Sequence, residues 1–353
     1  MLVVMKHGAT GEEIDRVAET IREMGYEAEP IPGRQRTAVG LIGNDGRVDD
    51  GRLRVLPGVQ RIIHVSQPYK QVSREWKPDD TVVELPNGVR VGGPDVVLIA
   101  GPCSVESEEQ IMDTARRVRA AGATILRGGA FKPRTSPYSF QGLGERGLEL
   151  LALARRETGL AVVTEALGPE DVELVAGYTD IIQIGARSMQ NYPLLREAGR
   201  AGKPILLKRG MGSTIKELLL AAEYIVLEGE SRVILCERGV RSFDHHARNL
   251  LDLTAIASVQ ELSHLPIIAD PAHGTGHRDK VVPMARAAVA AGADGVMVEV
   301  HPEPASALSD GAQSLTPDQY DEMVVEVTAI ARAIGRGIAR ATEVRTESVA
   351  AGG

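Results

Sequence analysis

From Val96 onward, apolar strand-like runs alternate eight times with helix-compatible stretches. The runs are VVLIAGPC, TILRGG, LAVVTEAL, IIQIGAR, PILLKRG, RVILCERG, PIIADPAH and GVMVEVHP. Nearly continuous apolar strands are typical of a parallel sheet that is buried on both faces. Eight β/α units in about 250 residues match a TIM barrel, and an open doubly wound sheet is the alternative. We therefore expect an α/β fold with a (β/α)8 catalytic barrel over residues 96–340.

The chain ahead of the barrel has a different pattern. Residues 1–68 show the order β-α-β-β-α-β, which is that of a small α+β ferredoxin-like domain. The pattern alone does not distinguish this domain from several other small α+β units. Residues 69–95 read as a charged linker followed by a β-hairpin, because two β-type runs flank Asn87-Gly88, a strong signal for a tight type I′ turn. Residues 341–353 are small and polar, and we expect a disordered tail there.

Composition excludes several classes of protein. The formal net charge of −8 argues against general nucleic-acid binding. Two cysteines in 353 residues cannot form a disulfide framework, which favours a reducing compartment. The start lacks a signal-peptide layout, and no apolar run approaches the roughly 18 residues of a membrane helix. We therefore expect a cytoplasmic protein with no membrane partner.

Four residues at the carboxyl ends of the predicted strands could bind a divalent metal. Cys103 ends the first strand, His273 follows the seventh, Glu299 lies near the end of the eighth, and Asp310 is in the loop beyond it. Active sites of such barrels lie at this end, and thiolate, imidazole and carboxylate are all metal ligands. Taken singly, each has a structural alternative, such as packing for the thiol or a turn for the histidine.

A second group at the same end is cationic or hydroxylic. Its members are Arg127, Lys132, Arg134, Thr135, Ser136, Arg187, Lys208, Arg209, Arg238 and Arg241. Buried strand-end cations are costly unless they meet anions, so the group predicts a site for multiply charged anions. The alternative is internal pairing with Glu165, Glu237 or Asp270, which are too few to neutralise all of them. By contrast, Cys236 reads as a packed thiol, and the pair His245-His246 as a solvated loop.

Long motifs in this region resemble one enzyme family. They are GPCSVES, RGGAFKPRTSPYSFQGLG, QIGARSMQN, LLKRGM, ILCERGVRSF, DPAHGTG and VEVHPEPASALSDGAQSL, spread over about Lys70 to Gly337. Together they resemble 3-deoxy-D-arabino-heptulosonate 7-phosphate (DAHP) synthase, in the Iβ form with an N-terminal ferredoxin-like domain. Ser188 and His277 depart from the pattern that this form usually shows, which leaves only local detail open.

The resemblance implies a reaction and roles for the residues. The family condenses phosphoenolpyruvate with erythrose 4-phosphate and water, as the first step of the shikimate pathway, and releases phosphate. Implied metal ligands are Cys103, His273, Glu299 and Asp310, with Mn²⁺ favoured and Fe²⁺, Co²⁺, Zn²⁺ or Cd²⁺ also suitable. Implied phosphoenolpyruvate ligands are Arg127, Lys132, Arg187, Lys208 and Arg238, and implied aldehyde-substrate ligands are Arg134, Thr135 and Ser136. Lys132 is the expected proton donor, so the implied catalytic residues are Lys132, Cys103 and His273.

Alternatives remain at this point. The sister enzyme that makes 3-deoxy-D-manno-octulosonate 8-phosphate from arabinose 5-phosphate shares the barrel, but it resembles KANRSS where this chain has KPRTS. A non-catalytic barrel that binds phosphorylated ligands is a second alternative. For residues 1–68 the resemblance implies feedback inhibition by tyrosine or phenylalanine, against a purely structural role. It also implies a homo-oligomer, with a tetramer favoured.

Overall fold

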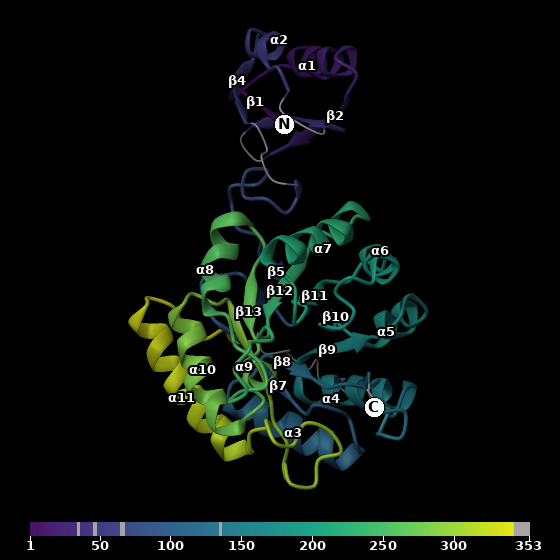
Figure 1. Ribbon diagram of the computed structural model, residues 1–353, viewed down its shortest axis with the longest axis vertical. Coiled ribbons are helices and arrows are strands. Elements are labelled where there is room, and N and C mark those ends of the chain that lie inside the picture. Colours follow the sequence, from purple (N-terminus) through teal and green to yellow (C-terminus); the bar gives the residue numbers. More distant parts are fainter. Residues whose placement is uncertain (34–35, 45–47, 64–67, 134–135, 342–353) are drawn as a thin grey trace, which may run out of the picture. The chain divides into compact units, whose positions relative to one another are not determined.

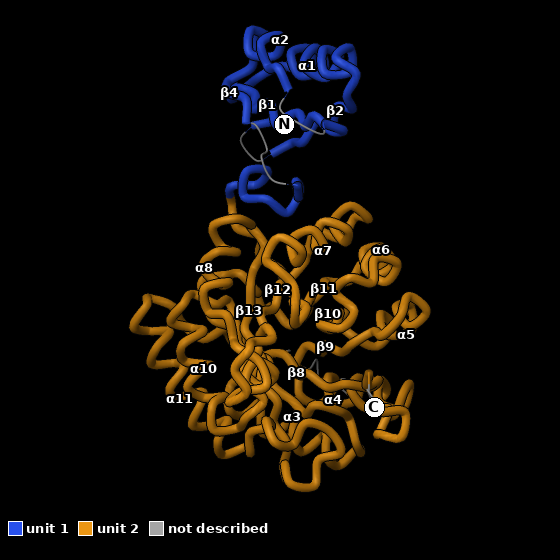
Figure 2. The backbone as a smooth tube through the Cα atoms, viewed as in Figure 1, with its two compact units in different colours: residues 1–78 blue, residues 79–353 orange. Residues whose placement is uncertain are grey.

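The computed structural model describes residues 1–33, 36–44, 48–63, 68–133 and 136–341. Arg134 and Thr135, and most of the tail expected to be disordered, lie outside the described residues. Two units can be distinguished, Met1–Pro78 and Asp79–Gly353 (Figure 2).

The first unit is a four-stranded antiparallel sheet with two helices (Figure 1). Its elements in chain order are β1 (Leu2–Met5), α1 (Gly11–Glu23), β2 (Glu27–Pro32), β3 (Thr37–Ile42), α2 (Gly51–Arg54) and β4 (Val59–Ile63). The strand order β2-β3-β1-β4 places the first strand between the third and the fourth, which confirms the ferredoxin-like arrangement expected from the sequence.

Helix α1 shows why this unit folds locally. Thr10 accepts a hydrogen bond from the backbone of Glu13, and the Glu13 carboxylate accepts one from the backbone of Thr10, so the first turn is capped on both sides. Val17, Ala18 and Ile21 recur at helical spacing and are buried against the sheet.

The second unit contains a closed barrel of eight parallel strands, which confirms the expected fold. The strands are β7 (Val97–Gly101), β8 (Ile125–Arg127), β9 (Ala161–Ala166), β10 (Ile181–Ile184), β11 (Ile205–Lys208), β12 (Val233–Glu237), β13 (Ile267–Ala269) and β14 (Gly295–Glu299). Strand β14 pairs with β7 to close the ring, so the sheet has no free edge.

Helices follow the strands and surround the barrel (Figure 1). They are α3 (Glu108–Ala121), α4 (Glu145–Thr158), the short 3-10 helix Pro169–Asp171, α5 (Val172–Tyr178), α6 (Tyr192–Arg200), α7 (Ile215–Leu227), α8 (Leu253–Leu262), α9 (Pro271–Thr275), α10 (Arg278–Ala290) and α11 (Pro317–Ala333). Among the helices of the described residues, none is long and apolar enough to cross a membrane.

The predicted hairpin, β5 (Val83–Glu84) and β6 (Arg90–Val91), covers the amino-terminal end of the barrel. Its apolar side chains pack into one cluster with the barrel interior, which also contains the fully buried Cys236. Asn87 donates to the backbone carbonyls of Thr124 at 2.9 Å and Gly159 at 3.3 Å. The opposite end of the barrel is therefore left for the site.

The turn of this hairpin differs from the expected type I′. That turn needs a positive φ at both Asn87 and Gly88, but of the two only Gly88 has one, at 78°. The Leu85 amide donates to the carbonyl of Val89, and the Gly88 amide donates to that of Leu85. The loop is thus three residues long and begins with Pro86, whose ring holds φ negative and suits the second position of a turn.

Candidate functional site

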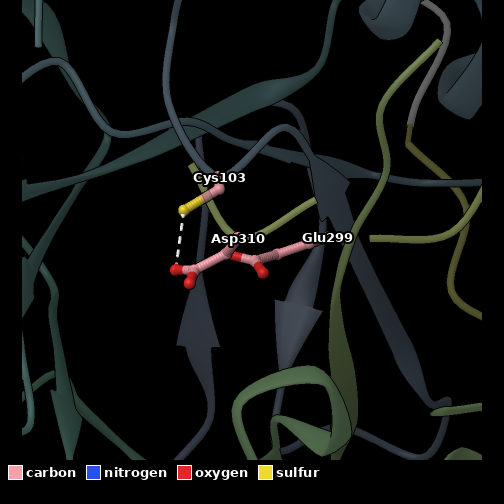
Figure 3. A group of neighbouring side chains, drawn as sticks. All are labelled: Cys103, Glu299 and Asp310. Atoms are coloured by element: carbon pink, nitrogen blue, oxygen red, sulfur yellow. Dashed lines mark hydrogen bonds between the residues drawn. The ribbon is translucent and has the colours of Figure 1, made fainter. Parts of the chain in front are cut away.

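Three of the four predicted metal ligands form one cluster (Figure 3). Cys103 follows β7, Glu299 is the last residue of β14, and Asp310 lies in the loop after β14. One ligand atom from each lies within 4.8 Å of those of the other two. The Cys103 thiol donates a hydrogen bond to Oδ2 of Asp310 at 3.2 Å.

His273 completes this cluster from α9. Its Nδ1 lies 2.7 Å from Oδ2 of Asp270, the N-cap residue of the same helix. Its Nε2 lies 3.5 Å from Oε1 of Glu299 and 3.9 Å from Oδ2 of Asp310. A histidine that donates Nδ1–H to a carboxylate keeps its Nε2 lone pair for a metal. The structure therefore brings all four predicted ligands together.

The chemistry of these donors fits a divalent cation. One sulfur, one imidazole nitrogen and two carboxylates are suitable for several transition metals without selecting one. Burial first, and then the charge of Glu299, raise the pKa of the Cys103 thiol to about 12, so a bound cation would have to displace its proton. Asp310 has a φ of 49°, and of the described residues other than glycine it is the one with a positive φ. Such strain is commonly found at functional sites.

A cavity of about 350 Å³ opens above this cluster. Predicted site residues that line it are Arg127, Lys132, Ser136, Arg187, Lys208, Arg238, His273 and Asp310. Cys103 and Glu299, with 2 % and 1 % of their surface exposed, do not line the cavity themselves but contact lining residues. Cys103 hydrogen-bonds to Lys132 and Asp310, and Glu299 lies beside Arg127 and His273. The cavity is therefore cationic on its walls and has the possible metal donors at its floor.

Lys132 connects the wall of the cavity to its floor. Its ammonium group donates to the Sγ of Cys103 at 3.0 Å and to the carbonyl of the same residue at 3.1 Å. Burial alone would lower the pKa of Lys132, but the acidic groups that face it, Cys103 and Glu299, raise it above its ordinary value. Lys132 is therefore protonated at neutral pH.

Two of the cations are paired with carboxylates at the floor. Nη1 of Arg127 lies 2.6 Å from Oε1 of Glu299, and Nζ of Lys208 lies 2.5 Å from Oδ2 of Asp270. Burial opposes ionisation of Asp270, but His273 and Lys208 hold the pKa of its carboxyl well below its ordinary value. Lys208 thus makes the internal ion pair that the sequence analysis gave as the alternative to anion binding, and it also lines the cavity.

Arg187 and Arg238 provide the unneutralised charge. Among the described residues, neither has a carboxylate within ion-pair distance, and the one hydrogen bond of the Arg238 guanidinium goes to the carbonyl of Gly239 at 3.4 Å. Both line the cavity. Burial lowers the pKa of Arg238, although arginine stays charged at any physiological pH. Their guanidinium groups are therefore available to an anion in the cavity.

Two further cations of the predicted group do not line the cavity. Nη1 of Arg209 lies 2.8 Å from Glu237 and 2.9 Å from Asp252, so its role is structural. Arg241 is exposed and also lies outside the cavity wall. His245 and His246 are exposed, as expected for a solvated loop, and neither belongs to the cluster found among the described residues.

Several residues of the site carried no clear signal in the sequence. Gln313 donates to Oε2 of Glu299 at 2.6 Å, and Gln183 donates to Oε2 of Glu165 at 3.0 Å. Arg248 lines the cavity, and its Nη1 lies 3.5 Å from Oδ1 of Asp310. Gln313 and Arg248 come from irregular loops, so only the folded chain shows where they meet the predicted ligands.

Comparison with known proteins supports both units. A family model described as "DAHP synthetase I family" matches residues 80–333, and one described as "DAHP synthase ferredoxin-like domain" matches residues 1–67. The chain is 50 % identical over 335 residues to the phospho-2-dehydro-3-deoxyheptonate aldolase of Thermotoga maritima, covering 95 % of this chain and 99 % of that one. It is 36 % identical over 257 residues to the 2-dehydro-3-deoxyphosphooctonate aldolase of Syntrophotalea carbinolica, covering 68 % and 92 %.

Two solved structures show the same similarity. The crystal structure of the Thermotoga maritima DAHP synthase matches with a TM-score of 0.77 at 49 % identity, covering 96 % of this chain and 98 % of that one. A truncated form of the same enzyme matches with a TM-score of 0.71 at 50 % identity, covering 76 % and 98 %. With a converging donor set at the mouth of its barrel and this similarity over nearly its whole length, the chain belongs to the DAHP synthase family of carbon–carbon bond-forming enzymes.

Proposed function

We propose that this protein condenses phosphoenolpyruvate with erythrose 4-phosphate and water to give DAHP and phosphate. The observation that carries the proposal is the cationic cavity whose floor holds Cys103, His273, Glu299 and Asp310. A phosphorylated enol acid and a phosphorylated aldehyde are both anions, and such a cavity stabilises negative charge before and during the reaction.

The four clustered donors are proposed to hold one divalent cation, with Mn²⁺ the first candidate. When bound, such an ion supplies Lewis-acid polarisation of a carbonyl oxygen. Asp270 fixes the ring of His273 through Nδ1, and Gln313 fixes the carboxylate of Glu299. These contacts hold the donor atoms in place, so little reorganisation is needed at the site.

The cavity walls are proposed to bind the enol substrate. Arg187 and Arg238 are suited to its carboxylate and phosphate, since a guanidinium group can bind two oxygens at once. Arg127 and Lys208 are held by Glu299 and Asp270, and each adds a fixed charge to the wall. Ser136, with Arg134 and Thr135 outside the described residues, is proposed to bind the aldehyde substrate.

Lys132 is proposed to deliver the proton that the new alkoxide takes up. It is buried, protonated and within hydrogen-bond distance of the cluster, which are the properties of a general acid. The C3 carbon of phosphoenolpyruvate attacks the aldehyde carbon, and its oxygen gains the proton from Nζ. Water then adds at the electron-poor C2 and gives up one proton, which restores the ammonium group of Lys132. The new C2 hydroxyl passes its proton to the phosphate as the C2–O bond breaks, leaving the ketone and inorganic phosphate.

A phosphate-release assay tests the proposal. We expect turnover with phosphoenolpyruvate and erythrose 4-phosphate, its loss after treatment with a chelator, and its return on adding Mn²⁺. Fe²⁺, Co²⁺, Zn²⁺ and Cd²⁺ added in parallel would rank the metals. The same assay with arabinose 5-phosphate tests the second candidate, favoured by the 36 % identical octulosonate relatives. Phosphate release from phosphoenolpyruvate with arabinose 5-phosphate, and none with erythrose 4-phosphate, would overturn the proposal.

For the first unit we propose a regulatory role through binding of tyrosine or phenylalanine. Its support is the match of residues 1–67 to a separate domain family. Each amino acid added to the assay should lower turnover of the full chain, and deletion of residues 1–68 should abolish that inhibition while activity remains. Inhibition that survives the deletion would contradict this role. A cytoplasmic homotetramer remains our proposal for location and assembly, and sedimentation of the full chain tests the latter.

A further inference from the structure

A buried polar network joins the segment after β7 to the loop after β14. Oε1 of Glu106 accepts a hydrogen bond from the backbone amide of Leu308 at 2.9 Å. The same oxygen lies 3.4 Å from the hydroxyl of Ser104, which also shares a short hydrogen bond with the hydroxyl of Ser309. Ser104 and Ser309 are 0 % and 4 % exposed. Contacts separated by about two hundred residues in sequence thus converge on one carboxylate.

The other oxygen of Glu106 faces His301. Oε2 lies 3.4 Å from Nε2 of this histidine, whose Nδ1 accepts a hydrogen bond from the backbone of Glu303 at 3.0 Å. Because Nδ1 is an acceptor, a neutral His301 carries its proton on Nε2. This buried nitrogen makes no hydrogen bond within the described residues, and the Glu106 carboxylate lies within ion-pair distance of it. Glu106 therefore connects to both ends of the segment that runs from Glu299 to Asp310.

This polar network lies directly beside two of the proposed metal ligands. Ser104 directly follows Cys103, and Ser309 directly precedes Asp310. On the far side of Asp310, Arg278 donates to the carbonyl of Gly311 at 2.8 Å. Asp310 itself has the strained φ of 49°, which persists only where neighbouring contacts hold the backbone. Glu106 holds the near side of this residue and Arg278 the far side.

We propose that Glu106 is a positioning residue for the metal site. It fixes the Asp310 loop against the Cys103 segment, so that the thiol and the carboxylate are set at ligand distance before a cation arrives. This inference rests on the metal site proposed above. Removing a group that hydrogen-bonds a metal ligand directly weakens metal affinity by about 10- to 100-fold. Glu106 acts one step further out, through Ser104 and Leu308, so we expect an effect at the lower end of this range.

Metal affinity measured by competition with a fluorescent chelator tests the role of Glu106. Glu106→Ala should raise the Kd for Mn²⁺ by about 10-fold. With Co²⁺, the thiolate-to-cobalt absorption band should weaken or shift, because the thiol and carboxylate no longer meet the ion together. Glu106→Gln keeps an oxygen for the amide of Leu308 and should recover much of the affinity.

The matched control is Glu109→Ala, which removes the same charge from an exposed position three residues away. It should leave both the affinity and the cobalt band unchanged. If Glu106→Ala does not fold, Ser309→Ala removes only the hydroxyl shared with Ser104 and should weaken binding in the same direction. A wild-type chain that binds no metal would refute the metal site itself. Normal affinity and an unchanged cobalt band in folded Glu106→Ala would overturn this inference alone.

Discussion

Replacing Arg209 with methionine separates a structural role from an anion-binding one. The guanidinium group donates to Glu237 at 2.8 Å, to Asp252 at 2.9 Å and to the carbonyl of Ser213 at 2.8 Å. Glu237 is 0 % exposed, so the variant leaves a buried carboxylate without its cation. Removing one partner of a buried pair typically costs about 3–5 kcal/mol. In a barrel of this size each kcal/mol lowers Tm by about 2–4 °C, so we expect a fall of at least about 6 °C.

A second substitution checks the cause of the loss. Arg209→Met combined with Glu237→Gln removes the more deeply buried of the two carboxylates that lose their partner, and leaves only Asp252 without it. An oxygen at position 237 can still accept from the amide of Gly239, a hydrogen bond of 2.6 Å in the wild type. The double variant should therefore be more stable than Arg209→Met by at least about 1 kcal/mol. Scanning calorimetry of the full chain measures the transition of the barrel in both.

Kinetics provide the complementary measurement. Arg209 does not line the cavity, so the KM for phosphoenolpyruvate in the folded single variant should stay within about twofold of that of wild type. An unchanged Tm together with a KM raised tenfold or more would refute this reasoning and return Arg209 to the anion site.

Three further predictions concern the cavity and the hairpin that covers the amino-terminal end of the barrel. Lys132→Met should lower kcat by about 100-fold or more, and intact turnover with raised KM values in steady-state assays would contradict proton delivery. Arg248→Ala should raise the KM of one anionic substrate at least about tenfold, since the variant loses a charged donor; His246→Ala in the same loop is the control. Asn87→Ala should destabilise the chain by about 1–3 kcal/mol in calorimetry, because the variant loses the hydrogen bonds to Thr124 and Gly159. Its kcat should be unchanged, since these bonds lie at the end of the barrel opposite the site.

The parallel sheet was predictable because its strands are continuous apolar runs, which are typical of burial on both faces. The count of eight β/α units then favoured a closed barrel over an open doubly wound sheet. Arg209 is one of the strand-end cations for which the sequence left internal pairing with Glu237 open, and it makes that pair. Lys208 and Arg209 are consecutive at a strand end, and successive side chains of a strand point to opposite faces. The motif LLKRG cannot show which of the two faces the cavity. In the structure Lys208 lines the cavity, whereas Arg209 lies outside the cavity wall and pairs with Glu237.

The remaining differences have similar physical reasons. The hairpin was visible in its two β-type runs, but its turn depends on which residues pair, and the bond from Leu85 to Val89 sets a three-residue loop. Gln313 and Arg248 were missed because they belong to loops without periodicity. Their position beside Glu299 and Asp310 follows from tertiary contacts between segments distant in sequence.

Asn87 joins the hairpin to the amino-terminal end of the barrel through backbone acceptors, and this has a consequence for how related sequences can diverge. Its amide donates to two backbone carbonyls, and these are present whatever side chains stand at positions 124 and 159. These two hydrogen bonds therefore depend on the side chain at position 87 and not on the side chains of their acceptors. In related chains we therefore expect Asn87 to stay the same, and Gly159 with it because its φ of 71° favours glycine, while other small side chains can replace the buried Thr124.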